Sequence, residues 1–167
     1  LKDKVGAKVL DMCTGSGCIA VSLSKNLSNI EVYASDISNN ALKVAQENAK
    51  INDARVKFFY SDLFTNIPGE KFDMIVSNPP YIESHKINGL AKDVLKEPLM
   101  ALDGGEDGLR FYREISEKAR YFLKDEGTLA FEIGYNQANA VSNILKELNY
   151  KEIKIIKDYS NNDRVIV

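Results

Sequence analysis

The sequence predicts an α/β fold with a mostly parallel sheet of seven strands and a terminal antiparallel hairpin. Short apolar runs of strand length alternate with amphipathic stretches of helical period, which is typical of crossover units that place parallel strands side by side. The last two apolar runs are not separated by a helix, and the turn-rich residues 158–163 between them predict the hairpin.

The first half of the chain alternates four predicted strands with two predicted helices. Apolar residues recur at helical spacing in the first helix, and Ser38 or Asn39 caps the second. The predicted strands are residues 7–12, 30–35, 56–60 and 72–77. The predicted helices are residues 18–27 and 38–49.

The second half begins with residues 82–107, which show only weak signals for helix or strand. The predicted helices beyond this segment are residues 109–123 and 136–148. The predicted strands are residues 128–133, 151–157 and 164–167.

Length and composition describe one globular domain. The chain has 167 residues, 44% hydrophobic and 28% charged, which are proportions typical of soluble proteins. Its net charge of −2 argues against a nucleic-acid partner, because binding to a phosphate backbone needs a basic surface. Cys13, Cys18 and His85 lack the spacing of a metal site, and both cysteines are expected to be free thiols. No apolar stretch is long enough to cross a membrane. We expect a soluble cytoplasmic protein, and we also expect a monomer and no metal ion.

Polar side chains stand at the carboxyl ends of the predicted strands. Asp11, Asp36, Asp62 and Asn78 lie at the ends of the first four strands, and Glu132 lies near the end of the fifth. Ligands of open parallel sheets bind at this edge. Any one of these residues can be a turn residue or a helix cap, but their joint occurrence predicts a binding site.

The loop after the first strand has the composition of a nucleotide-binding turn. Gly15 and Gly17 let the backbone approach a ligand, and Asp36 follows about 20 residues later, where its carboxylate can accept both hydroxyl groups of a ribose. The stretch from Gly15 to Ala20 also matches the G-x-G-x-x-G/A pattern, so an NAD site has to be considered.

Two carboxylates favour a different adenosine cofactor. Asp11 precedes the glycines, where it would repel a diphosphate but attract a cationic ammonium group, directly or through water. Asp62 is placed to meet an adenine amino group, and Leu63 to pack on the ring. An adenosine that carries a cationic amino acid in place of phosphates is S-adenosylmethionine. The candidate cofactor-binding residues are Asp11, Cys13, Thr14, Gly15, Ser16, Gly17, Asp36, Ile37, Asp62, Leu63 and Asn78.

The fourth strand ends at the sequence Asn78-Pro79-Pro80-Tyr81. Proline donates no backbone hydrogen bond, so the strand stops there and Asn78 is biased towards an extended conformation. The Asn78 side-chain oxygen and the Pro79 carbonyl can accept the two hydrogens of a planar –NH2 group, on which Tyr81 can stack. The four residues alone leave open a Pro-Pro turn with a packed tyrosine. The candidate catalytic residues are Asn78, Pro79, Pro80 and Tyr81.

Together these motifs resemble the class I methyltransferases, which have a Rossmann-like fold. The longer pattern is similar to the release factor glutamine methyltransferases of the HemK/PrmC type, over essentially the whole chain. The stretches that carry this similarity are residues 76–82, 97–98, 101–109, 111–112, 132–134 and 163–165. The Asn-Pro-Pro-Tyr box alone is shared with adenine-N6 DNA methyltransferases and some RNA guanine methyltransferases.

The resemblance implies methyl transfer from S-adenosylmethionine to the side-chain amide nitrogen (N5) of the glutamine in the Gly-Gly-Gln motif of peptide chain release factors, with S-adenosylhomocysteine as product. It also implies that residues 1–167 are a single catalytic domain and that the N-terminal helical substrate-binding domain of the family is absent from this chain. The family usually has glycine at the position of Cys13, and because cysteine adopts positive φ less readily, we expect an ordinary backbone conformation there. The alternatives are a methyltransferase acting on adenine or guanine in DNA or RNA, an NAD oxidoreductase, and a cofactor-binding fragment that is inactive without the missing domain.

Overall fold

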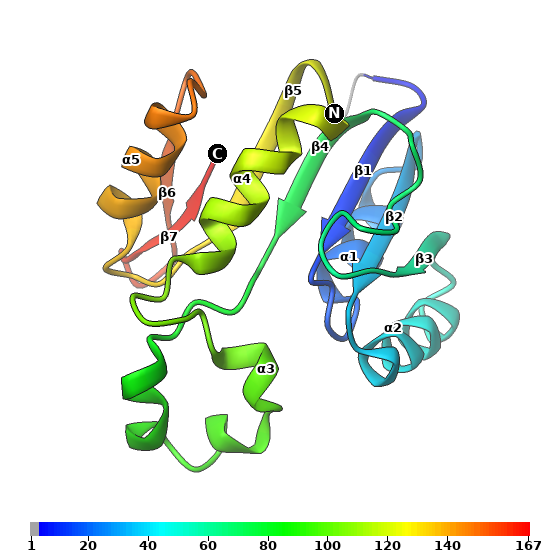
Figure 1. Cartoon of the computed structure of the whole chain (residues 1–167). Helices are drawn as coiled ribbons and strands as arrows, with labels where there is room; N and C mark the ends of the chain where they lie inside the picture. Colours follow the sequence, from blue (N-terminus) through cyan, green and yellow to red (C-terminus); the bar gives the residue numbers. More distant parts are fainter. Residues whose placement is uncertain (1–3) are drawn as a thin grey trace. The chain divides into compact units, whose positions relative to one another are not determined.

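The computed structural model describes residues 4–167, in which seven strands form one mixed sheet (Figure 1). The strands are β1 (Ala7–Met12), β2 (Ile30–Asp36), β3 (Val56–Tyr60), β4 (Phe72–Ser77), β5 (Leu123–Glu132), β6 (Ile155–Lys157) and β7 (Asp163–Ile166). The helices are α1 (Cys18–Asn26), α2 (Asn39–Ile51), α3 (Leu99–Leu102), α4 (Arg110–Phe122) and α5 (Ala138–Glu147), with 3-10 turns η1 (Ser84–Gly89) and η2 (Val94–Lys96). The strand order is β3-β2-β1-β4-β5-β7-β6.

The chain divides into two compact units. The first comprises the residues up to Ser77 together with Lys118–Leu129, and the second comprises Asn78–Glu117 together with Ala130–Val167. The two groups of candidate residues therefore fall in different units: the cofactor candidates up to Leu63 lie in the first, and the loop from Asn78 to Tyr81 begins the second.

The first unit has parallel strands with β1 between β2 and β4. Val9 of β1 pairs with Val32 of β2 and with Met74 of β4, so these three side chains face the same side of the sheet. Ala20 of α1 is fully buried against Val32 and Ala34 of β2, so α1 packs on this face of the sheet. Val9 is 0% exposed, as expected for a central parallel strand that is covered on both faces.

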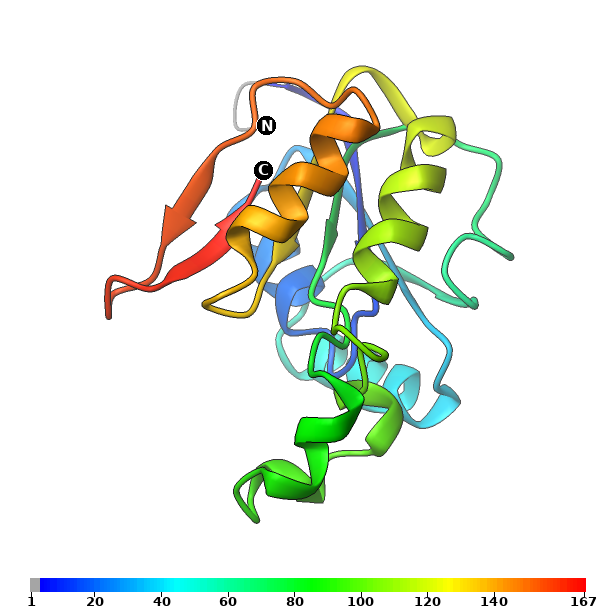
Figure 2. The same cartoon turned by 60° about the vertical axis from the view of Figure 1, so that its left-hand side comes forward.

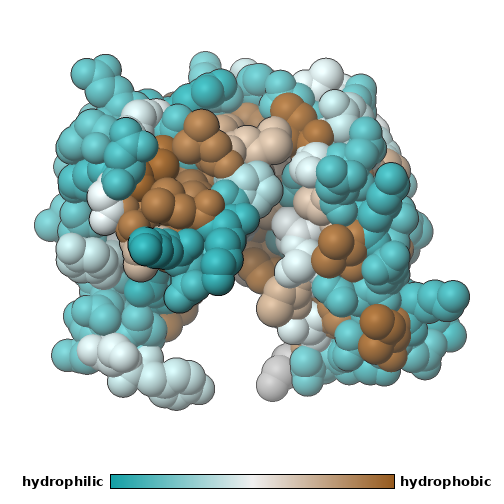
Figure 3. All heavy atoms as spheres, turned by 90° about the horizontal axis from the view of Figure 1, so that it is seen from below, coloured by the Kyte–Doolittle hydropathy of each residue, from teal (hydrophilic) through white to brown (hydrophobic). Residues whose placement is uncertain are grey.

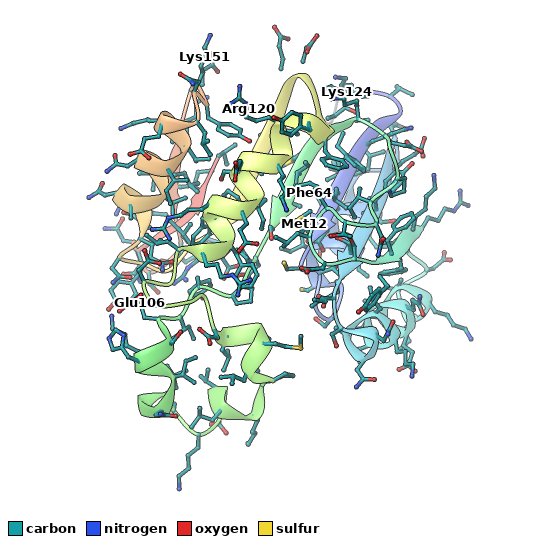
Figure 4. All side chains as sticks on the ribbon, in the orientation of Figure 1. Met12, Phe64, Glu106, Arg120, Lys124 and Lys151 are labelled. Atoms are coloured by element: carbon teal, nitrogen blue, oxygen red, sulfur yellow. The ribbon has the colours of Figure 1, made fainter. Side chains whose placement is uncertain are left out.

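A buried carboxylate joins the start of β4 to three lysines. The Asp73 side chain is 3% exposed and lies 2.6 Å from Lys4 Nζ and 2.7 Å from Lys124 Nζ (labelled in Figure 4), and it accepts the backbone N–H of Lys8 at 2.8 Å. Burial alone would raise the pKa of Asp73, but the hydrogen bonds from these lysines outweigh it and hold the pKa well below its ordinary value. Asp73 is therefore ionised and stabilises the first unit through these ion pairs.

The second unit contains the antiparallel end of the sheet. β7 pairs with the end of β5, where Phe131 faces Ile166, and with β6, where Ile155 faces Ile166. Figure 2 shows β6 and β7, in orange and red, side by side as a hairpin. Tyr112 of α4 is fully buried and meets the Phe131 ring edge to face at 5.2 Å.

The predicted fold, a mostly parallel seven-stranded sheet with a terminal hairpin, is confirmed. Two predicted strand boundaries are wrong. β5 begins at Leu123 rather than at residue 128, and β6 begins at Ile155 rather than at residue 151. Glu152 has a φ of 55°, and a residue in the left-handed region cannot continue an extended strand. Residues 82–107 contain η1, η2 and α3, which are too short to give a clear periodic signal.

The described surface carries free thiols and scattered apolar side chains. Cys13 and Cys18 are both free, as predicted. Leu95, Leu99 and Met100 are exposed on η2 and α3, and Figure 3 shows brown, hydrophobic atoms among hydrophilic ones on the face seen from below. Within residues 4–167, no helix has the length and apolar character needed to cross a membrane. No group of three or more His, Cys, Asp or Glu side chains in the same residues is arranged to hold a metal ion.

Candidate active site

The loop after β1 turns through three residues with positive φ. These are Cys13 at 58°, Gly15 at 55° and Gly17 at 79°. The N–H of Gly17 donates to the Thr14 carbonyl at 2.8 Å and closes the turn. A Cβ on Gly17 would lie 2.9 Å from the Cβ of Ala45, so glycine at this position allows α1 and α2 to approach closely.

Cys13 lies in the left-handed region, and the expectation of an ordinary backbone conformation there is wrong. Hydrogen bonds to the residues before and after Cys13 fix its backbone conformation. The carbonyl of Met12 (labelled in Figure 4) accepts the Ser77 hydroxyl at 2.7 Å, and the N–H of Thr14 donates to the Ser35 carbonyl at 3.0 Å. A positive φ costs a non-glycine residue about 1–2 kcal/mol, which these bonds offset. Burial raises the pKa of the Cys13 thiol to about 12, so the thiol is neutral at physiological pH.

Asp11 is a buried carboxylate with one unpartnered oxygen. Asp11 is only 1% exposed. Its Oδ2 accepts the Thr14 hydroxyl at 2.6 Å and the Ala20 N–H at 3.0 Å. Oδ1 has no hydrogen-bond partner among the described residues. Burial raises the pKa of Asp11 to about 7, and the nearby Asp36 carboxylate adds to this effect. A buried carboxylate oxygen without a donor is unfavourable, so this site fits a cationic ligand group.

Asp36 at the end of β2 ties the loop to the start of α2. Its Oδ2 accepts the Gly15 N–H at 2.9 Å, and its Oδ1 accepts the Ser38 N–H at 2.8 Å. Each carboxylate oxygen has a second lone pair, so Asp36 can still accept the hydroxyl groups of a ribose. Ile37, the next residue, is 42% exposed and offers apolar surface beside it.

Asp62 and Leu63 follow β3 in different environments. The Asp62 side chain is exposed, whereas Leu63 is 7% exposed with a φ of 45°. Little of Leu63 is therefore left to pack on an adenine ring. The carboxylates of Asp36, Asp11 and Asp62 all raise the pKa of Cys13, which places the three predicted carboxylates around the loop after β1.

The Asn78-Pro79-Pro80-Tyr81 segment, here called the acceptor loop, leads from β4 into the second unit. Asn78 is exposed, Pro79 is buried, and Tyr81 is half-buried. Just beyond it, the Ile82 N–H donates to the Leu102 carbonyl at 2.9 Å, and the Gly104 N–H donates to the Ile82 carbonyl at 2.8 Å. These bonds join the acceptor loop to the residues around Gly104 in a short parallel bridge.

Two glycines allow residues 104–108 to contact the backbone of the acceptor loop directly. A Cβ on Gly104 would lie 2.7 Å from the Tyr81 Cα and 2.9 Å from the Pro80 carbonyl oxygen. A Cβ on Gly108, whose φ is 70°, would clash with the Tyr81 carbonyl oxygen. Residues 104–108, here called the Gly-rich stretch, are therefore a packing surface for the acceptor loop.

The phenol of Tyr81 lies near charged residues of the second unit. Burial raises the pKa of its phenol and the Glu132 carboxylate adds to this, while the positive charge of Arg164 opposes both. Arg164 is itself fixed, because it donates to the Ile133 carbonyl at 3.2 Å and to Asp158 Oδ2 at 3.2 Å.

Gln137 is a site residue that the sequence does not reveal. It is 8% exposed, and its Nε2 donates to the carbonyl oxygens of Tyr81 at 3.0 Å and Gly108 at 3.2 Å. Its Oε1 accepts the Gly134 N–H at 3.0 Å and lies 3.3 Å from the Tyr112 hydroxyl. Tyr81 and Gly108 are 56 and 29 residues away in sequence, so only the place of Gln137 next to the Glu132-Ile133-Gly134 stretch could have pointed to it.

Relatives of known name match the chain over nearly its whole length. The release factor glutamine methyltransferase of Thermodesulfovibrio yellowstonii is 40% identical over 100% of this chain and 61% of its own length. The enzyme of the same name from Clostridium acetobutylicum is 46% identical over 96% of this chain and 58% of its own length. The resemblance to this family is confirmed at the level of sequence. The chain spans about three fifths of the length of these curated relatives.

A family model and a solved structure agree with the architecture. The crystal structure of a methyltransferase from Pyrococcus furiosus has a TM-score of 0.75 to this chain at 21% identity, covering 98% of this chain and 74% of that one, which shows the common fold. The family model described as methyltransferase small domain matches residues 1–106, which include the loop after β1, the three carboxylates and the acceptor loop. The chain therefore belongs to the methyltransferase small domain family.

Proposed function

We propose that this chain transfers a methyl group from S-adenosylmethionine to the side-chain amide nitrogen of the glutamine in the Gly-Gly-Gln motif of peptide chain release factors. The observation that carries the proposal is the 40–46% identity, across at least 96% of this chain, to enzymes named release factor glutamine methyltransferase. In this proposal residues 1–167 act as a single catalytic domain, as a cytoplasmic monomer without a metal ion.

The residues of the first unit suit the proposed cofactor. The unpartnered Oδ1 of Asp11 would accept the cofactor's ammonium group, and Asp36 the ribose hydroxyls. Asp62 is exposed and free to meet the adenine amino group, next to the apolar surface of Ile37. When bound, S-adenosylmethionine supplies a methyl group on a sulfonium, whose C–S bond breaks as the N–C bond to the acceptor forms.

The acceptor loop suits a planar amide. An amide nitrogen is a weak nucleophile because its lone pair is delocalised into the carbonyl. Asn78 Oδ1 and the Pro79 carbonyl would accept its two N–H groups and stabilise the positive charge that develops on the nitrogen. Tyr81 would hold the amide plane and thereby its approach to the methyl group. The methylated nitrogen is acidic enough to release a proton to water, so the loop needs no buried base.

Transfer of a labelled methyl group from S-adenosylmethionine to a purified release factor tests the proposal. We expect label in the wild-type release factor and none when its Gly-Gly-Gln glutamine is replaced by asparagine. A DNA duplex and a transfer RNA serve as alternative acceptors in the same assay. Label in either nucleic acid, with none in the release factor, would overturn the assignment of the acceptor.

A further inference from the structure

We propose that Gln137 is a positioning residue that holds the acceptor loop in the conformation needed for methyl transfer. The inference rests on the proposed function, because it assigns Gln137 a task in the same reaction. Gln137 belongs to neither group of candidate site residues, and it lies at the start of α5, 56 residues after Tyr81.

Both ends of the Gln137 amide are hydrogen-bonded. Its two N–H groups donate to the Tyr81 carbonyl at 3.0 Å and to the Gly108 carbonyl at 3.2 Å. Its oxygen accepts the Gly134 N–H at 3.0 Å. The single proton of the Tyr112 hydroxyl is shared between this oxygen at 3.3 Å and the Glu132 carbonyl at 3.1 Å. Two donors on one side and two acceptor positions on the other are available only from a primary amide. Asparagine has the same group on a shorter side chain, so glutamine is the residue that this set of partners requires.

The four partners come from separate pieces of the second unit. Tyr81 belongs to the acceptor loop, Gly108 to the Gly-rich stretch, Gly134 to the turn after β5, and Tyr112 to α4. A Cβ on Gly108 would lie 2.9 Å from Gln137 Nε2, so the side chain is in close contact with this backbone. Gln137 therefore links the acceptor loop to the rigid elements behind it.

The link acts on the backbone atoms next to the proposed clamp. Tyr81 follows the two prolines directly, and the prolines donate no hydrogen bonds, so the N–H groups that can anchor this stretch must come from elsewhere. Gln137 supplies one such donor to the Tyr81 carbonyl. Because methyl transfer depends on alignment, a shift of about 1 Å in the loop can lower turnover by roughly 100-fold.

The variant Gln137→Glu distinguishes a positioning role of the Gln137 hydrogen bonds from a role in packing alone. The variant keeps the shape and an acceptor oxygen, but it replaces the two N–H donors with a second oxygen that faces two carbonyl oxygens. We expect kcat for release factor methylation to fall roughly 10- to 100-fold and the Kd for S-adenosylhomocysteine to stay within about 2-fold. Protonation of the new carboxyl restores one donor, so the ratio of variant to wild-type kcat should rise about 3- to 10-fold from pH 8 to pH 5.5.

Two further variants serve as comparisons. Gln137→Met keeps the length without any donor or charge, so it should lose turnover and show no recovery at low pH. Gln46→Glu makes the same chemical change at an exposed position of α2, so it should behave like the wild type in every assay. Normal turnover in Gln137→Glu, a parallel loss of cofactor affinity, or an equal effect of Gln46→Glu would overturn the proposal.

Hydrogen exchange followed by mass spectrometry tests the same link without a substrate. In Gln137→Glu the amides of Ile82 and Gly104 should exchange roughly 10- to 100-fold faster, while those of β1 and β2 keep their wild-type rates. If the wild-type protein binds S-adenosylhomocysteine but does not methylate a release factor, the proposed function fails. In that case the exchange rates alone decide whether Gln137 holds the acceptor loop. Unchanged rates at Ile82 and Gly104 would show that it does not.

Discussion

Replacing Asp11 with asparagine should stabilise the ligand-free protein at alkaline pH and weaken the binding of S-adenosylhomocysteine. Asp11 is 1% exposed, its Oδ1 has no partner among the described residues, and its pKa is raised from 3.8 to about 7. One pKa unit corresponds to about 1.4 kcal/mol, so the ionised carboxylate destabilises the fold by about 4 kcal/mol. Asparagine keeps an oxygen for Thr14 and Ala20, while its unpartnered N–H group costs about 1–3 kcal/mol. A net gain of about 1–3 kcal/mol above pH 8 follows.

The dependence on pH has a defined sign. The folded pKa of Asp11 lies above the unfolded value, so the wild type keeps this contribution to stability below about pH 4 and loses it as the pH rises through 7. Urea unfolding should show that the stability of Asp11→Asn relative to wild type increases by about 2–3 kcal/mol from pH 5 to pH 8. Calorimetry should show S-adenosylhomocysteine binding weakened roughly 10- to 100-fold, because the cationic group loses its charged partner.

Asp73→Asn is the matched control, and its effect has the opposite sign. The pKa of Asp73 is held low by Lys124 and Lys4, so its ionised form stabilises the fold above the unfolded pKa and loses this effect only as the pH falls through the folded pKa. The variant leaves these lysines without their counter-charge and should be less stable than wild type at pH 8. The reasoning about Asp11 fails if Asp11→Asn is also less stable at pH 8, or if its difference from wild type does not change with pH.

Three further substitutions test separate parts of the proposed site. Asn78→Ala should lower the rate of methyl transfer at least about 100-fold and leave the Kd for S-adenosylhomocysteine within about 2-fold, and near-normal turnover would contradict the clamp. Asp36→Ala should weaken this ligand by roughly 2–3 kcal/mol in calorimetry, since Asp36 also holds the Gly15 N–H, and an unchanged affinity would count against it. Gly108→Ala should lower turnover and the free energy of unfolding by about 1–3 kcal/mol, because its Cβ would meet the Tyr81 carbonyl at a positive φ. Gly69→Ala is its control, since a Cβ there meets nothing within 4 Å, and an equal loss in both variants would refute the account.

The sequence was sufficient where local patterns determine structure. Apolar runs that end at Asp11, Asp36 and Asn78 fix both the parallel strands and the edge at which candidate side chains appear. Such a pattern needs only neighbouring residues, and the fold was therefore predictable. The strand boundary before Ile155 was not, because it depends on the left-handed conformation of Glu152, a residue type that rarely adopts it.

Features that depend on residues far apart in the chain could not be predicted from the sequence. Cys13 has a positive φ because Ser35 and Ser77, on two neighbouring strands, hold the residues on either side of it. The role of Gln137 depends on carbonyl groups 29 and 56 residues away, which no local periodicity reports. The Asn78-Pro79-Pro80-Tyr81 motif can be recognised in the sequence, whereas the contacts that orient it can be seen only in the structure.

The short parallel bridge between Ile82 and Asp103 also closes off residues 85–101 as a separate loop of the second unit. The N–H of Ser84 donates to the Gly105 carbonyl at 3.0 Å, next to the bonds that join Ile82 with Leu102 and Gly104, so the chain leaves and returns at one fastened point. The intervening residues 85–101 form an excursion whose length does not affect the fastening, since loop closure depends only weakly on loop length. The length of this excursion can therefore change while the same residues hold the acceptor loop. Grafting the corresponding stretch of a relative, with Ser84 and Gly105 retained, should leave the thermal stability of the chain within a few degrees of its original value.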